Sequence, residues 1–146
     1  MKNYTPYMYW SKTDLAEQLI SLSHKVNAPR EVRELISAAI ASDLWDPRKE
    51  YDGCTAVQDM FHPCTSCFLH DYLWKTGQGG READKLFHLL MRIEGMDKAR
   101  ARRRWLGVRI IWLTVYKWKH LAKRNVNKLE PIFEKTLQHL INTQVK

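Results

Sequence analysis

The sequence predicts an all-α domain, and three observations lead to that prediction. Apolar residues recur every three or four positions over most of the chain, as they do along one face of a helix. Patterns typical of strands are weak throughout. The length of 146 residues is close to the most common size of one domain, and no internal repeat divides it. We therefore expect a single domain over residues 1–146, with five or six helices around one antiparallel helix pair.

The N-terminal third is expected to contain two helices. Leucines recur at helical spacing from Thr13 onward and predict an amphipathic helix that ends near Lys25. Asn27 suits the N-cap of the next helix, and Pro29 is tolerated in its first turn. The dipeptide at 46–47, Asp-Pro, is expected to end that second helix.

The rest of the chain is expected to add four helices. Residues 48–62 show no helical period, and Pro63 then begins a short helix. A Gly-rich turn separates it from a helix over residues 81–94. A long helix over 97–124, which is rich in basic residues and tryptophan, and a final helix over 129–142 complete the prediction.

The segment from residue 51 to residue 94 contains the residues best suited to chemistry. His70 and Asp71 are adjacent in one expected helix, and Asp84 lies in the next. Because a short turn joins these helices, we expect them to pack antiparallel. Asp84 could then accept a hydrogen bond from one ring nitrogen of His70, while the other nitrogen takes a proton from water. Asp71 could bind calcium with oxygens of the loop that contains Asp52 and Gly53.

A second interpretation assigns these residues no chemistry. In that interpretation His70 and Asp71 are half-exposed residues of an ordinary helix, and Asp84 is a solvated carboxylate. For an isolated His-Asp dipeptide this second interpretation is the usual one, whereas the helix–Gly turn–helix context that contains Asp84 favours the first.

Three short patterns in residues 51–87 resemble a known family. They are DG at 52–53, HDYL at 70–73 and EAD at 82–84. Together they resemble the catalytic helix pair of the phospholipase A2 superfamily, and most closely its short phage and bacterial members. The resemblance covers about a quarter of the chain. It implies an all-α, calcium-dependent phospholipid esterase, encoded by a phage or a bacterium.

The resemblance also implies a role for each matching residue. His70 would be the general base, Asp84 the carboxylate that orients it, and Asp71 a calcium ligand together with the loop at 52–53. The family usually has tyrosine four residues after the histidine, bonded to the same carboxylate. This chain has Trp74 there, whose indole N–H can donate instead. The residues expected to support the histidine are Tyr72 and Trp74.

A zinc site is an alternative use of the same region. Zinc prefers four nitrogen or sulfur ligands in a tetrahedron. The expected ligands would be Cys54, Cys64, Cys67 and His70. Cysteines three residues apart on a helix are equally typical of a buried face, so core cysteines are the simpler interpretation.

The cysteine count and the N-terminus bear on the compartment. Three cysteines are an odd number, which argues against a disulfide framework and favours a reducing compartment such as a host cytoplasm. Residues 1–7 lack the apolar core of a signal peptide, and no apolar run is long enough to span a membrane. Location in a virion is compatible with these features.

The formal net charge of +8 favours an anionic partner. Residues 98–128 contain no acidic side chain, and tryptophans are interspersed among their basic residues. The middle of this segment, 105–116, is nearly apolar all round, which predicts a buried core helix. Its basic end is expected to meet an anionic phospholipid surface or nucleic acid. The residues expected to make this contact are Lys98, Arg100, Arg102, Arg103 and Arg104.

Three classes of function are compatible with these observations. The first is a calcium-dependent, phospholipase A2-like ester hydrolase. The second is a catalytically degenerate component of a phage or viral particle, which contacts nucleic acid or neighbouring subunits. The third is a small zinc-stabilised binding module.

Overall fold

The all-α prediction is confirmed by a computed structural model that describes residues 11–43, 45–50, 65–78, 80–111 and 130–144. No strand occurs in these ranges, and six of the helices have 11 to 14 residues. The described helices are α1 (Lys12–Lys25), α2 (Arg30–Ala41), α3 (Pro47–Glu50), α4 (Thr65–Lys75), α5 (Arg81–Ile93), α6 (Lys98–Ile111) and α8 (Pro131–Gln144).

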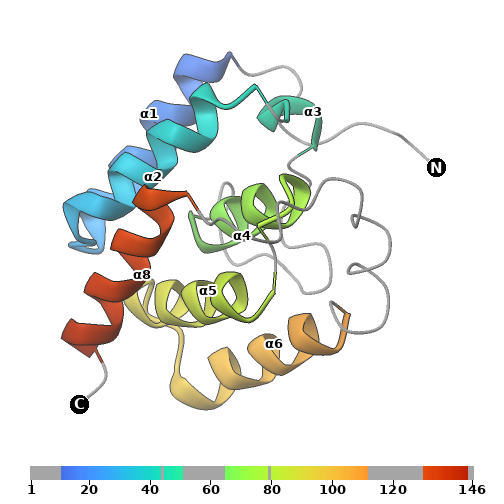
Figure 1. The fold of residues 1–146 in the computed structure, drawn as a ribbon. Helices are drawn as coiled ribbons and strands as arrows, with labels where there is room; N and C mark the ends of the chain where they lie inside the picture. Colours follow the sequence, from blue (N-terminus) through green and yellow to red (C-terminus); the bar gives the residue numbers. More distant parts are fainter. Residues whose placement is uncertain (1–10, 44, 51–64, 79, 112–129, 145–146) are drawn as a thin grey trace.

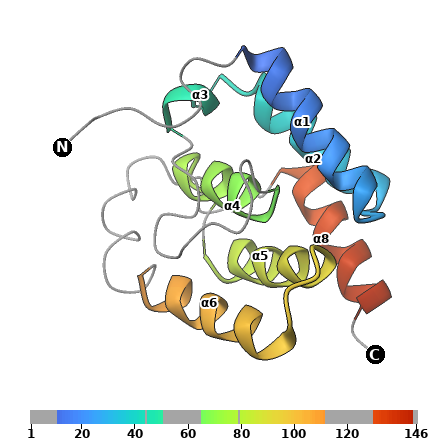
Figure 2. The ribbon, with the colours of Figure 1, turned by 180° about the vertical axis from the view of Figure 1, so that it is seen from behind.

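Helix α4 lies at the centre of the molecule. It packs against α5 on one side, and α5 in turn packs against α6, so that these three helices form successive layers (Figures 1 and 2). Helices α1 and α2 form a second pair that also contacts α4. Helix α8 crosses beside α2 and α5 and joins the two halves.

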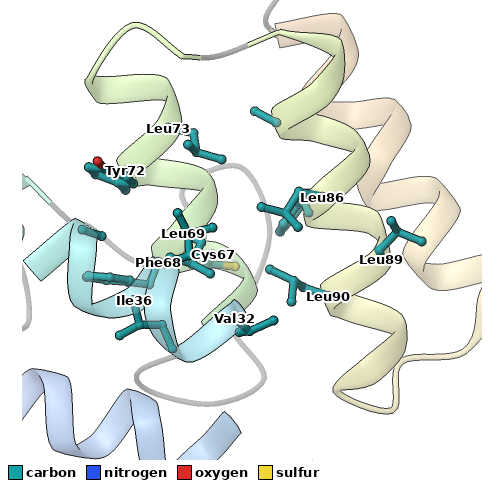
Figure 3. Packing of buried hydrophobic residues seen from close by; sticks show 14 of the residues in the cluster. Val32, Ile36, Cys67, Phe68, Leu69, Tyr72, Leu73, Leu86, Leu89 and Leu90 are labelled. Carbon is teal, nitrogen blue, oxygen red and sulfur yellow. The ribbon is translucent and has the colours of Figure 1, made fainter. Parts of the chain in front are cut away.

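The position of α4 determines the environment of its polar residues. Every side chain from Thr65 to Trp74 is buried. Leu69 and Leu73 face α5, where Leu86 and Leu90 lie opposite them (Figure 3). On its other side α4 meets α2 and α3. With apolar neighbours on several sides, burial favours hydrogen-bond partners inside the protein for the polar residues of this helix.

Helices α4 and α5 are linked at both ends of the pair, by a turn at one end and by a hydrogen bond at the other. At one end lies the short Gly-rich turn, in which Gly77 has φ +85° and the amide of Gln78 donates to the Leu73 carbonyl at 2.7 Å. These are features of a Schellman motif. At the other end the Ser66 amide, in the first turn of α4, donates to Glu94 Oε2 at 3.2 Å. The side chain of Glu94, at the end of α5, therefore accepts a hydrogen bond from a first-turn amide of α4, a position where helices offer no backbone acceptor of their own.

The prediction that Asn27 caps α2 is wrong. Asn27 has φ +56° and lies one residue beyond the C-cap of α1. Its amide donates to the His24 carbonyl at 3.1 Å, and the Ala28 amide donates to the Ser23 carbonyl at 2.9 Å. Asparagine is one of the few residues that adopt this left-handed conformation readily, so it closes the preceding helix instead of opening the next one. Pro29 takes the N-cap position of α2.

Two further expectations differ from the structure. Helix α3 begins at Pro47, so part of the stretch expected to lack helix is helical.

In α6, Leu106 and Ile110 are 45% and 61% exposed, so the described part of the apolar segment is not buried all round. Only one stripe of α6, with Ala101 and Val108, faces the core. Pro63 and residues 112–124, over which the basic helix was expected to continue, lie outside the described residues.

Candidate functional site

His70 of α4 and Asp84 of α5 meet inside the protein. The distance from His70 Nε2 to Asp84 Oδ1 is 2.6 Å, and the two residues are 7% and 0% exposed. The predicted contact is confirmed, and the interpretation that these residues are half-exposed and solvated is wrong. Because a carboxylate oxygen accepts, Nε2 donates and the neutral ring is left with its acceptor at Nδ1. This is the arrangement that a histidine base requires.

Aromatic rings hold the imidazole in place. The ring centroids of Trp74 and Phe87 lie 4.4 and 4.5 Å from that of His70. The indole of Trp74 also donates from Nε1 to Asp84 Oδ1 at 3.1 Å. The sequence indicated that this indole could donate, and the structure directs it to the same oxygen that His70 contacts.

Arg109 completes the group and was not expected from the sequence. Its Nη1 donates to Asp84 Oδ2 at 2.8 Å, so both carboxylate oxygens of Asp84 are engaged. The side chain of Arg109 is 18% exposed and reaches Asp84 from α6. One signal was available: Arg109 is the only charged residue in the apolar stretch 105–116, and a charge in such a place needs a buried partner.

Asp71 is buried beside this group but is not part of it. It is 7% exposed and has an interaction partner of its own. Its proposed calcium partners, Asp52 and Gly53, lie outside the described residues. Within the described ranges no three His, Cys, Asp or Glu side chains are grouped as a metal site. Asp71 is thus the one predicted calcium ligand that the structure places.

Cys67 is disulfide-bonded. The sequence argues against a disulfide framework, but an odd number of cysteines still allows one pair, and Cys67 belongs to such a pair. A disulfide sulfur is not a thiolate and does not bind zinc. The other two cysteines of the zinc alternative, Cys54 and Cys64, lie outside the described residues. His70, the fourth residue of that set, already donates to Asp84.

No hydrogen bond joins the Tyr72 hydroxyl to His70 or Asp84. This hydroxyl donates to Glu130, the residue before α8, and Gln78 Nε2 donates to the same carboxylate oxygen at 2.6 Å. Burial, with the neighbouring Glu130 carboxylate, raises the pKa of Tyr72 well above its ordinary value. Its contact therefore ties α4 to α8 instead of supporting the histidine.

The basic end of α6 is divided between surface and interior. Lys98, Arg100, Arg102 and Arg103 are exposed, as the expected anionic contact requires. Arg104 is only 7% exposed, so its inclusion in that surface is wrong. It occupies the inward stripe of the helix, one turn from Val108, and it has a partner within the protein.

Comparison with models of protein families, with curated proteins and with solved structures finds no match to this chain. The resemblance to phospholipase A2-like proteins therefore rests on the residues themselves. Among the described helices, none combines the length and the apolar character that crossing a membrane would need.

Proposed function

We propose that the chain is a phospholipase A2-like ester hydrolase in which His70 is the general base. The observation that carries this proposal is the 2.6 Å contact between His70 Nε2 and Asp84 Oδ1 in a buried site. The carboxylate fixes the ring so that Nδ1 is the acceptor, and it stabilises the imidazolium that forms when that nitrogen takes a proton. The phospholipid substrate is suggested by the DG, HDYL and EAD patterns and by the exposed basic residues of α6.

The proposed reaction needs a water molecule next to Nδ1. His70 removes one proton from this water as its oxygen attacks the ester carbonyl. The tetrahedral intermediate then breaks its bond to the alcohol oxygen, and the imidazolium returns the proton to that oxygen. Arg109 and Trp74 also donate to Asp84, and these contacts hold its carboxylate in place beside His70.

In this proposal Asp71 would hold a calcium ion. Asp71 offers a hard oxygen ligand one residue from the base, and the loop at Asp52 and Gly53 would supply the others. Bound there, the cation would polarise the ester carbonyl and offset the negative charge that develops on it.

Hydrolysis of anionic phospholipid vesicles tests the proposal. Wild type should release fatty acid in calcium and lose that activity in a chelator. His70→Gln should lower the rate by about 10²–10⁴-fold, as removal of a general base does. His24→Gln is the matched control, because His24 is exposed at the end of α1. Circular dichroism of each variant separates loss of chemistry from loss of fold.

A second candidate is a structural role without catalysis, such as a component of a phage or viral particle. The pairing of Asp84 with Arg109 favours it, because a buried carboxylate between a guanidinium and two other donors is also a typical fold-stabilising network. A folded wild type that hydrolyses no ester in calcium would leave this candidate standing and remove the hydrolase. A His70→Gln variant as active as an active wild type would instead overturn the assignment of His70 as the general base.

A further inference from the structure

A pocket lies between α5 and α6, apart from the His70–Asp84 pair. Its volume is about 250 Å³. The residues that line it are Lys85, His88, Lys98, Arg102 and Trp105. Both helices contribute: two residues come from α5 and three from one stripe of α6. None of them takes part in the proposed hydrolysis.

The cations of this pocket have no acidic partners among the described residues. No ion pair there involves Lys85, Lys98 or Arg102, whereas Arg30 and Arg109 each bond to a carboxylate.

The same cations act on His88. Burial lowers the pKa of His88, and the nearby cations Lys85, Arg92, Arg102 and Lys98 add to the effect. A concave site with this many uncompensated positive charges attracts anions.

The size and chemistry of the pocket restrict the anion. Pockets for whole drug-sized ligands span about 300–1,000 Å³, so this volume suits one small group and not a large molecule. Arginine and lysine together recognise phosphate oxygens, the first with a planar fork and the second as a point charge. Trp105 lies edge-on to His88, with 6.4 Å between ring centroids, and forms an apolar wall.

We propose that the pocket between α5 and α6 binds a phosphate group, held by Lys85, Lys98 and Arg102 with His88 beside it. The phosphate group is either free or carried by a lipid headgroup. If the ligand is a lipid, its apolar part would lie against Trp105. This proposal does not depend on catalysis by His70.

Bound phosphate has a specific consequence for His88. The charged groups that face this imidazole are Lys85 and Arg92 of its own helix and Lys98 and Arg102 of α6. A phosphate dianion among them offsets their repulsion of an imidazolium. The pKa of His88 should therefore rise on binding, and NMR of the histidine ring signals over a pH titration measures that rise.

Binding of inorganic phosphate is measured by calorimetry and by the same NMR signals. The pocket variant is Lys98→Gln/Arg102→Gln, and the matched control is Arg100→Gln/Arg103→Gln, which removes the same charge from exposed positions of the same helix. The pocket variant should bind at least about tenfold more weakly, because two charge-assisted contacts are lost. The control should change affinity by less than about threefold, as expected for long-range attraction alone.

The source of the phosphate is distinguished by a second ligand. Dihexanoyl phosphatidic acid, kept below its micelle concentration, is compared with inorganic phosphate in the same titrations. Tighter binding of the lipid by about tenfold or more assigns the pocket to a headgroup, and equal binding assigns it to free phosphate. The proposal is overturned if neither ligand shifts the His88 signals, or if the two double variants lose equal affinity.

Discussion

Arg109 is the cationic partner of Asp84, and its removal should lower the free energy of unfolding. Arg109→Gln would leave a wholly buried carboxylate without its cationic partner. Breaking a buried ion pair from one side costs about 3–5 kcal/mol, so we expect unfolding free energy to fall by roughly that amount. Urea denaturation measures it. Arg103→Gln, on the exposed face of the same helix, should change stability by less than about 0.5 kcal/mol. Equal losses in the two variants would show that Asp84 is compensated by other groups.

Trp74 contributes both a ring and a donor, and a substitution can separate them. Trp74→Phe keeps an aromatic ring beside His70 but removes the indole N–H that reaches Asp84 at 3.1 Å. We expect a loss of about 1.5–3 kcal/mol in stability, typical of a hydrogen bond to a charged group. In an Asp84→Asn background the same change should cost much less, because the charged acceptor is gone. Additive losses in this double-mutant cycle would contradict the coupling.

The sequence allowed part of this side-chain network to be predicted. The contact between His70 and Asp84 was expected, because a short turn between two helices restricts which residues can meet. Arg109 was missed because it lies 25 residues from Asp84, in a third helix. Helical periodicity reports which face of a helix is buried, but it does not report which residue of another helix that face meets.

The helices themselves depend on a few backbone conformations. Gly95 ends α5 with φ +95°, and a Cβ at this position would meet nothing within 4 Å. Gly95→Ala should therefore cost only the strain of a left-handed alanine, about 1–2 kcal/mol. Gly107 lies inside α6, also with open space around it, so Gly107→Ala should stabilise by about 0.5–1 kcal/mol. Thermal unfolding of both variants checks the opposite signs, and a shift in the same direction would contradict the assignment.

Helix positions were easier to predict than helix ends. The expected helices at 81–94 and 129–142 lie within two residues of α5 and α8, because their apolar periodicity is strong. Asn27 was misassigned because asparagine suits both the start of one helix and the end of another. Only the φ angle distinguishes these uses, and sequence alone does not supply it.

The stability of the folded chain should depend on pH at both extremes. The pKa of His88 is lowered from its ordinary 6.5, so the unfolded chain takes up this proton first and stability falls as the pH drops below about 6.5. The pKa of Tyr72 is raised from its ordinary 10.0, so the unfolded chain loses this proton first and stability falls as the pH rises above about 10. Between these limits both groups are neutral in the folded and unfolded chain.

Two substitutions should each weaken the dependence of stability on pH, one at the acidic extreme and one at the basic extreme. His88→Gln should lose less stability than wild type as the pH falls below about 6.5, and Tyr72→Phe should lose less above about pH 10. Urea midpoints measured across this range check both. The comparison is of slopes, since either substitution also changes stability at neutral pH. A wild-type slope that persists unchanged in both variants would assign the pH dependence to other residues.

The contact between Glu94 and the Ser66 amide has a consequence for the alignment of α4 and α5. The Gly-rich turn fixes these helices at one end, and Glu94 fixes them at the other. Helix residues are spaced about 1.5 Å along the axis, so a slip of one residue would exceed the tolerance of a hydrogen bond. A pair joined at only one end could slide by this amount as the protein fluctuates. Joined at both ends, α4 and α5 keep a single register, and the separation of His70 and Asp84 follows from that register.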